Sequence, residues 1–294
     1  MTPRSTPKSD HGPTRRHFLQ AAGIATAALA SAGSGWALAA APETAPRSPR
    51  KPAKLTLGLA SYSLRKFDLD KTIAMTCRVG LDHICLKSMH LPLDSKPEQI
   101  AAAVEKIKAA GLVLYGCGVV AMHKPAEVAQ AFDYAKAAGM ARIVAMPVPE
   151  MLPLLNEKVQ QYDIQIAIHN HGPGDKVWPT PQSAYDKIQK LDKRVGLCID
   201  IGHTVRAGVD LDDAVEKCAD RLYEIHMKDV TAATAKGKAT QVGRGIIDIP
   251  KFLKTLIKVH YAGVVAFEYE EEPDDPLPGL GESVGYTKGV LAMI

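Results

Sequence analysis

From Leu55 onward, short apolar segments alternate with longer amphipathic segments along the chain. The apolar segments are rich in Val, Ile and Leu, as expected of strands buried on both faces of a parallel sheet. Strands that alternate with helices predict consecutive βαβ units, in which all strands run parallel. We therefore predict eight strands, at Leu55–Ser61, His83–Lys87, Leu112–Val119, Arg142–Pro147, Gln165–His169, Val195–Asp200, Leu222–Lys228 and Gly263–Glu268.

The amphipathic segments between these strands predict helices. Asp248 ahead of Pro250 is a typical helix start, and Gly80, Gly111 and Gly139 stand where helices commonly end. Eight strand–helix units in about 240 residues match the size of a (β/α)8 barrel. The predicted helices cover residues 68–80, 97–110, 125–138, 150–162, 181–191, 211–219, 248–259 and 281–293.

A doubly wound open sheet is the alternative way to arrange alternating strands and helices. Its dinucleotide-binding form has a glycine-rich fingerprint directly after the first strand. Here the first strand runs into Ser61-Tyr62-Ser63-Leu64-Arg65, which has no glycine. The sequence therefore predicts an α/β fold with a single (β/α)8 TIM barrel over residues 54–294.

The N-terminal segment has a different character. Residues 1–39 combine a polar, basic start, the pair Arg15-Arg16, an Ala- and Gly-rich apolar segment and the small residues Ala37-Leu38-Ala39. This layout is typical of a secretory signal peptide, and paired arginines indicate the twin-arginine export route. The apolar segment lacks the Leu and Ile density of a stable membrane span. We expect export to the periplasm or the extracellular space.

Residues 40–53 hold four prolines and no hydrophobic periodicity, so they predict a linker. The whole chain has 36 Lys and Arg against 32 Asp and Glu, a net charge of +4. Residues 1–39 hold four of the basic residues and one acidic residue, which leaves 32 basic and 31 acidic side chains elsewhere. A nearly neutral folded part argues against a nucleic-acid partner bound through its phosphates.

The five cysteines include no Cys-x-x-Cys pair. Cys85, Cys117 and Cys198 lie inside predicted strands, where a thiol is expected to be buried and to pack as a small apolar group.

Ionisable residues gather at the carboxyl ends of the predicted strands, and these ends build the active site of a (β/α)8 barrel. Five of the ten histidines are among them. Lys87, His169, Asp200 and Glu268 are the last residues of the second, fifth, sixth and eighth predicted strands, and His90, His171, His203 and Glu270 follow them within three residues; the seventh strand contributes His226 and Lys228.

Four of these positions predict a metal site. His169, Asp200, His226 and Glu268 come from four consecutive strands whose inward positions converge on the barrel axis. Each alone has a structural explanation, such as a helix cap or a core histidine, but together they indicate metal ligands. Two imidazoles and two carboxylates suit Mn²⁺, Co²⁺, Fe²⁺ or Zn²⁺ better than Ca²⁺, which prefers oxygen ligands.

Three sequence motifs resemble a known family. Asp200-Ile-Gly-His203, Ile225-His226-Met-Lys228-Asp229 and Phe267-Glu268-Tyr-Glu270 are similar to motifs of the xylose isomerase-like TIM-barrel family, in particular its sugar phosphate isomerase/epimerase group. The resemblance runs from about Leu55 to the C-terminus and includes Gly243-Arg244-Gly245. It implies a divalent metal held at strands 5 to 8, and two glutamates that exchange protons with a sugar carbon.

The chain departs from this pattern after the fifth strand. The family usually has Glu-Asn-His there, whereas this chain has His169-Asn170-His171. Asp200, His226 and Glu268 match the family's metal positions, and His169 replaces the missing glutamate. Imidazole can ligate a metal but is a poor second carboxylate base, so the departure weakens the expectation of a two-glutamate mechanism. Whether His169 or His171 is the ligand stays open.

Other residues are candidates for substrate contacts. His203 matches the family's substrate-binding histidine, and Lys228 shares the inward face of its strand with His226, where it can stabilise a developing oxyanion. Lys87 and His90 can meet sugar hydroxyls, and Arg244 can reach an anionic group of the substrate. The alternatives are helix capping for His203, a carboxylate partner for Lys228, and rim or loop positions for the other three.

We expect a metal-dependent sugar isomerase or epimerase that removes a proton next to a metal-polarised carbonyl. Glu268 is the expected base, and His169 or His171 the second acid or base. The alternatives are a metal-dependent lyase on oxidised glycosides and an exported sugar-binding barrel without catalysis. Apurinic endonucleases share the barrel, but they need more metal ligands and a basic surface. The expected partner is a sugar or keto-sugar, with no nucleic acid; a homo-oligomer stays open.

Overall fold

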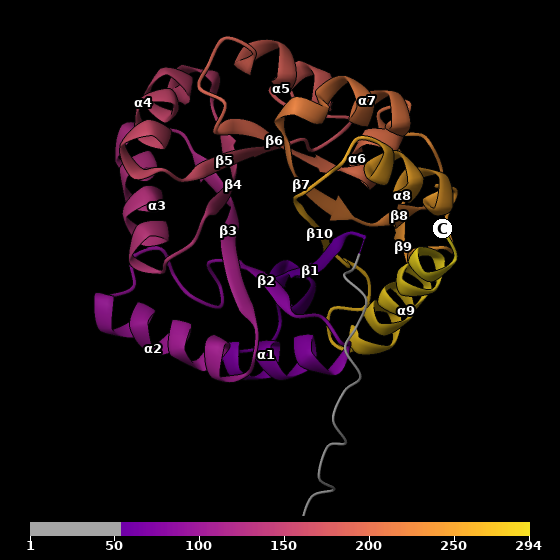
Figure 1. Ribbon diagram of the computed structural model, residues 1–294, viewed down its shortest axis with the longest axis horizontal. Helices are drawn as coiled ribbons and strands as arrows, with labels where there is room; N and C mark the ends of the chain where they lie inside the picture. Colours follow the sequence, from indigo (N-terminus) through magenta and orange to yellow (C-terminus); the bar gives the residue numbers. More distant parts are fainter. Residues whose placement is uncertain (1–53) are drawn as a thin grey trace, which may run out of the picture. The chain divides into compact units, whose positions relative to one another are not determined.

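The computed structural model describes residues 54–294. The predicted signal peptide (1–39) and linker (40–53) lie outside the described residues. Eight parallel strands form a closed barrel in the order β1-β10-β7-β6-β5-β4-β3-β2, which confirms the predicted fold (Figure 1). The strands are β1 (Thr56–Ala60), β2 (His83–Leu86), β3 (Val113–Met122), β4 (Arg142–Pro147), β5 (Gln165–His169), β6 (Val195–Asp200), β7 (Leu222–Met227) and β10 (Val264–Phe267).

A ring of helices surrounds the barrel (Figure 1). All eight predicted helices are present, and short 3₁₀ turns occur at Ser61–Leu64, Pro149–Met151 and Ala219–Arg221. The helices are α1 (Leu69–Arg78), α2 (Pro97–Ala109), α3 (Pro125–Ala137), α4 (Leu152–Tyr162), α5 (Pro181–Ile188), α7 (Leu211–Cys218), α8 (Ile249–Lys258) and α9 (Leu277–Met293). None of the helices in residues 54–294 is both long enough and apolar enough to span a membrane.

Local sequence signals explain where several helices begin and end. Asp248 caps α8 by accepting a hydrogen bond from the backbone N–H of Lys251, and such a cap contributes about 1 kcal/mol. Gly80, Gly111 and Gly139 follow α1, α2 and α3 with φ values of 76°, 77° and 67°, a conformation that glycine adopts without strain.

Two elements near the site were not predicted. Helix α6 (Ile201–Arg206) begins directly after β6, and Asp200 caps it. Six residues are too few to show a helical period. A small antiparallel hairpin, β8 (Asp229–Val230) with β9 (Ala239–Thr240), follows β7 and is equally short. The last helix begins at Leu277, earlier than the predicted residue 281.

The inside of the barrel is lined by small residues and by two polar clusters, one around Glu224 and one around Lys228. Its apolar lining includes Ala60, Ala167 and Ala266 together with the buried thiols of Cys85 and Cys198. A larger apolar core fills the space between the outer faces of the strands and the helices. Small side chains in the barrel leave room for the ionisable residues at its carboxyl end.

Candidate active site

Strand register brings the four predicted metal ligands together at the carboxyl end of the barrel. His169 and Asp200 are the last residues of β5 and β6, and Asp200 pairs with His226 in β7. Glu268 directly follows β10. One ligand atom from each of the four lies within 4.8 Å of the others.

Individual distances show how tightly the four side chains converge. His169 Nε2 lies 3.0 Å from His226 Nδ1 and 3.5 Å from Asp200 Oδ2. His226 Nδ1 lies 3.2 Å from Glu268 Oε2. All four residues are at most 6% exposed, so they are shielded from water.

The cluster fits a divalent transition metal. Nitrogen and oxygen ligands about 2.0–2.2 Å from one ion are themselves about 3–4 Å apart, and the three distances given above fall in this range. Asp200 Oδ2 and His226 Nε2 are buried and have no hydrogen-bond partner within the described part of the chain. A buried polar atom without a partner is costly, so His226 Nε2 favours a bound ligand, whereas Asp200 Oδ2 has Lys228 as an ion-pair partner.

Burial and charge set the protonation of the cluster. Burial lowers the pKa of His169 to about 3, so the imidazole is neutral and able to ligate a metal. Burial alone would raise the pKa of Asp200, but the charges of His203 and Lys228 hold it below its usual range. The same balance, with Lys228 and His226 outweighing burial, holds the pKa of Glu268 well below its usual range. Both carboxylates are therefore ionised.

Lys228 is the central cation of the site. Its Nζ lies 2.8 Å from Asp200 Oδ2, 2.9 Å from Glu268 Oε2 and 2.9 Å from Glu270 Oε1. Lys228 Nζ donates hydrogen bonds to Glu268 and Glu270 and forms an ion pair with Asp200. Burial would lower the pKa of Lys228, but the three carboxylates raise it well above the usual value. Gly202 of α6 packs on its stem, since a Cβ there would lie 2.6 Å from Cγ.

His171 and His203 adjoin the cluster. His171 Nδ1 is 3.4 Å from His169 Nδ1 and 3.8 Å from Asp175 Oδ2. The ring of His203 lies 5.8 Å from that of His171, between centroids. Their side chains are 32% and 17% exposed, so they are accessible to a substrate in a way that His169 is not.

Lys87 stands on the β2 side of the barrel mouth. Its Nζ donates a 2.6 Å hydrogen bond to Val119 O and lies 5.8 Å from the ring centroid of Tyr62. Burial lowers its pKa, although the charge of Glu268 opposes the shift. A cavity of about 370 Å³ borders Lys87 between β2, β3 and α3. Lys87 thus has one backbone partner, whereas Lys228 has three carboxylates.

Two predicted substrate contacts lie elsewhere. The ring of His90 is 2.8 Å from Ser61 Oγ and 3.1 Å from Leu64 O, and the residue is buried, so it joins the loops after β1 and β2. Arg244 forms a bidentate ion pair of 2.5 and 2.7 Å with Glu282 on α9. Both residues have internal partners that sequence could not reveal, and neither belongs to the cluster.

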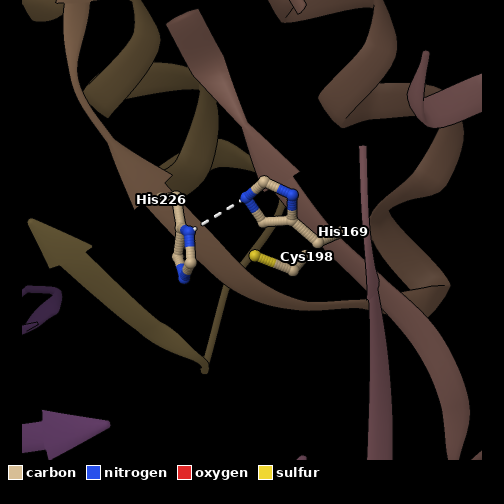
Figure 2. A group of neighbouring side chains, drawn as sticks. All are labelled: His169, Cys198 and His226. Carbon is tan, nitrogen blue, oxygen red and sulfur yellow. Dashed lines mark hydrogen bonds between the residues drawn. The ribbon is translucent and has the colours of Figure 1, made fainter. Parts of the chain in front are cut away.

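Two residues that position or adjoin the cluster, Asn170 and Cys198, are not among the predicted site residues. Asn170 Oδ1 accepts a 3.0 Å hydrogen bond from the backbone N–H of Asp200. Cys198 lies two residues before Asp200 and shares its inward face, so the strand period was a usable signal. Figure 2 shows its side chain beside the rings of His169 and His226.

The fold and the cluster together define a parallel (β/α)8 barrel with a candidate metal centre at the strand ends. Residues 78–289 match the xylose isomerase-like TIM barrel family, and the chain belongs to this family.

Curated relatives match only part of the chain. The rhizopine catabolism protein MocC of Rhizobium meliloti is 27% identical over 147 residues, which is 45% of either chain. An inosose dehydratase of Clostridium perfringens is 28% identical over 123 residues, 36% of this chain and 41% of that protein. The matches thus span less than half of these relatives.

A solved structure resembles most of the chain. The 3-keto-D-glucoside 4-epimerase of E. coli superposes with a TM-score of 0.67 at 15% identity, over 80% of this chain and 99% of that one. At this identity the likeness shows a shared fold.

Proposed function

We propose that the protein is a divalent-metal-dependent isomerase or epimerase of a sugar or keto-sugar, which acts by removing the proton on the carbon next to a carbonyl. The observation that carries the proposal is the convergence of His169, Asp200, His226 and Glu268, with Lys228 held against both carboxylates. These four residues would hold the ion, and Mn²⁺, Co²⁺, Fe²⁺ and Zn²⁺ all suit them. When bound, the ion supplies Lewis acidity toward the substrate oxygens.

Glu268 is the proton acceptor in this proposal. Its Oε2 is held by His226 and Lys228, whereas no hydrogen bond in residues 54–294 uses its Oε1. The free oxygen takes the proton, and the electron pair of the C–H bond moves toward the carbonyl oxygen. Lys228 stabilises the negative charge that develops there, because its ammonium group is fixed in a dry site before the reaction begins.

His171 returns a proton to the carbon. His169 is neutral and buried against Asp200 and His226, which suits a ligand and not a proton carrier. His171 is partly exposed and lies next to it. In this proposal His203, which is partly exposed, and Lys87 bind the sugar hydroxyls, and Arg244 can contribute only by leaving Glu282.

Proton exchange with solvent tests this proposal. The protein is freed of metal, reloaded with Mn²⁺ or Co²⁺, and incubated with ketoses and 3-keto-glucosides in deuterated water. We expect deuterium at the carbon next to the carbonyl and formation of an epimer. Glu268→Gln should slow exchange by roughly 10²–10⁴-fold, the usual contribution of a general base. An absence of exchange with either metal, and no stabilisation by them, would contradict the proposal.

Elimination is a second candidate, favoured by one feature of the site. Of the four candidate ligands, only Asp200 and Glu268 are carboxylates, and Asp200 caps helix α6. Glu268 is thus the single carboxylate that can act as a base, and elimination needs only one base. Inosose dehydratases are among the partial relatives. Here Glu268 takes the proton, and the leaving hydroxyl departs as water after protonation by His171. An absorbing unsaturated ketone would indicate elimination, whereas an epimer with unchanged mass apart from deuterium would indicate epimerisation.

We also propose that residues 1–39 direct export by the twin-arginine route. Arg15-Arg16, the apolar segment and Ala37–Ala39 support this proposal. The full chain should reach the periplasm of a host that has the twin-arginine translocase and stay in the cytoplasm when Arg15 and Arg16 are both replaced by Lys. Export that is independent of the paired arginines would contradict the route.

A further inference from the structure

A thiol lies within reach of two of the candidate metal ligands. Cys198 is on the inward face of β6 and pairs in register with His169 of β5. Its sulfur and one ring nitrogen each of His169 and His226 lie within 4.8 Å of one another. In Figure 2 the Cys198 side chain lies beside both imidazoles, with its sulfur directed toward His226.

Two further features make this group suitable for a metal. His226 Nε2 is buried without a hydrogen-bond partner in the described residues, although its Nδ1 already faces His169 and Glu268. All three residues are at most 2% exposed, so the group is dry. A thiolate with two imidazoles is a softer ligand set than two imidazoles with two carboxylates, and it favours Zn²⁺, Cd²⁺ and Cu⁺ over Mn²⁺.

We propose that His169, Cys198 and His226 form a second metal site that takes a thiophilic cation such as Cd²⁺. On binding, the Cys198 S–H bond breaks, its proton leaves to solvent, and the sulfur electron pair forms the bond to the cation. The site shares both imidazoles with the four-residue site, so the two sites are mutually exclusive. A thiophilic ion therefore draws His169 and His226 away from Asp200 and Glu268 and inhibits the protein.

The other cysteines supply the matched control. Among the described residues, Cys198 is the one cysteine that belongs to a cluster of this kind. Cys218 on α7 is likewise buried and free, and it has no part in either site. Cys218→Ser thus removes a buried thiol and leaves the proposed ligands intact.

The first experiment titrates the metal-free full chain with Cd²⁺ and records thiolate-to-metal charge transfer in the ultraviolet. We expect one Cd²⁺-thiolate per chain in the wild type and in Cys218→Ser, and complete loss of the band in Cys198→Ser and Cys198→Ala. Both Cys198 variants should still bind Mn²⁺, which shows that they are folded. The binding is measured as a loss of the free-ion Mn²⁺ resonance. A wild type without the band, or a band that persists in both Cys198 variants, overturns the proposal.

The second experiment separates this inference from the proposed function. Glu268→Gln should lose at least tenfold in Mn²⁺ affinity but keep the Cd²⁺-thiolate band, because Glu268 belongs only to the four-residue site. Mn²⁺ added in excess should reduce Cd²⁺ occupancy in the wild type and fail to do so in Glu268→Gln. Loss of the band in Glu268→Gln overturns the three-residue site. A failure of proton exchange contradicts the proposed function and leaves this site standing.

Discussion

Two polar clusters lie inside the same barrel, and they differ in how completely their atoms are paired. In the lower cluster, Arg142 Nη1 lies 2.7 Å from Glu224 Oε2, and Tyr115 donates a 2.5 Å hydrogen bond to Glu224 Oε1. Arg142 also donates to Gln165 at 3.0 and 3.2 Å. None of these side chains has an unpartnered buried atom.

The upper cluster, two residues further along β7, is incomplete. It holds the carboxylates of Asp200, Glu268 and Glu270 around the single ammonium group of Lys228. Asp200 Oδ2 and His226 Nε2 lack hydrogen-bond partners within residues 54–294. A network in which every buried polar atom has a partner stabilises the fold. A network with unpartnered atoms is costly unless a ligand supplies the missing partners. The upper cluster is therefore the one that we expect to bind a ligand.

The largest effect is expected from breaking the closed cluster. Glu224→Ala leaves the Arg142 guanidinium buried without its carboxylate, and the free energy of unfolding should fall by about 3–5 kcal/mol. Urea unfolding measures the loss, with Glu224→Gln as the control that keeps a hydrogen-bond acceptor. Adding Mn²⁺ should leave the difference in stability between Glu224→Ala and the wild type unchanged. A loss below about 1 kcal/mol would show that the lower cluster is dispensable.

Breaking the open cluster should have a rescuable effect. Lys228→Met removes the one ammonium group among three carboxylates, so the metal-free protein should lose about 2–4 kcal/mol. Mn²⁺ should recover most of this loss, because a divalent ion supplies positive charge to Asp200 and Glu268. Unfolding with and without Mn²⁺ measures the recovery. Equal destabilisation in both conditions would remove the distinction between the clusters.

A bound ion should stabilise the wild type directly. At a free concentration one hundred times its dissociation constant, Mn²⁺ should add about 2.7 kcal/mol to the free energy of unfolding. Asp200→Asn should abolish this increment. The control is Asp220→Asn at an exposed ion pair, which should keep it. If Mn²⁺ still stabilised Asp200→Asn against unfolding, the ion would bind at a site without Asp200.

Alkaline pH should weaken the lower cluster. Burial, and next the charge of Glu224, raise the pKa of Tyr115 well above its usual value. Above about pH 10 the unfolded chain loses the phenol proton while the folded chain keeps it, so stability falls as pH rises. The slope of unfolding free energy against pH should be smaller in Tyr115→Phe. That variant also loses about 1–3 kcal/mol at neutral pH, because Glu224 loses a donor. An unchanged alkaline slope would contradict this account.

The smallest effect is expected at an exposed ion pair. Arg244→Ala should change the free energy of unfolding by at most about 1 kcal/mol, since the Arg244 side chain is 62% exposed and its pairing with Glu282 is screened by water. The same variant tests the predicted substrate contact, because a raised KM for an anionic sugar would show that Arg244 reaches the substrate. An unchanged KM would leave Arg244 with its ion pair alone.

Local sequence patterns predicted most of the barrel. The eight barrel strands and eight of the nine α-helices of residues 54–294 arise from runs of apolar or amphipathic residues long enough to show a period. Helix α6 and the β8–β9 hairpin are shorter than such a period. Asp229 stabilises that hairpin region by accepting backbone hydrogen bonds from Gly243 and Gly245, contacts that no local pattern reveals.

The candidate site was predictable where strand ends dictate position. His169, Asp200, His226 and Glu268 converge because neighbouring parallel strands bring their last residues together. The partners of His90 and Arg244 depend on loops and on a helix far along the chain, so their positions required the structure. The Arg142–Glu224 pair joins β4 to β7 across the barrel, which no strand period shows. The strand period indicates that Cys198 points inward, but it does not reveal that the thiol lies beside two imidazoles.

Anomalous diffraction from crystals grown with Mn²⁺ tests the central claim most directly. We expect one strong anomalous peak per chain, within bonding distance of His169, Asp200, His226 and Glu268, and no peak at Arg142 and Glu224. A map without a peak among those four residues would contradict the claim that an ion completes the upper cluster.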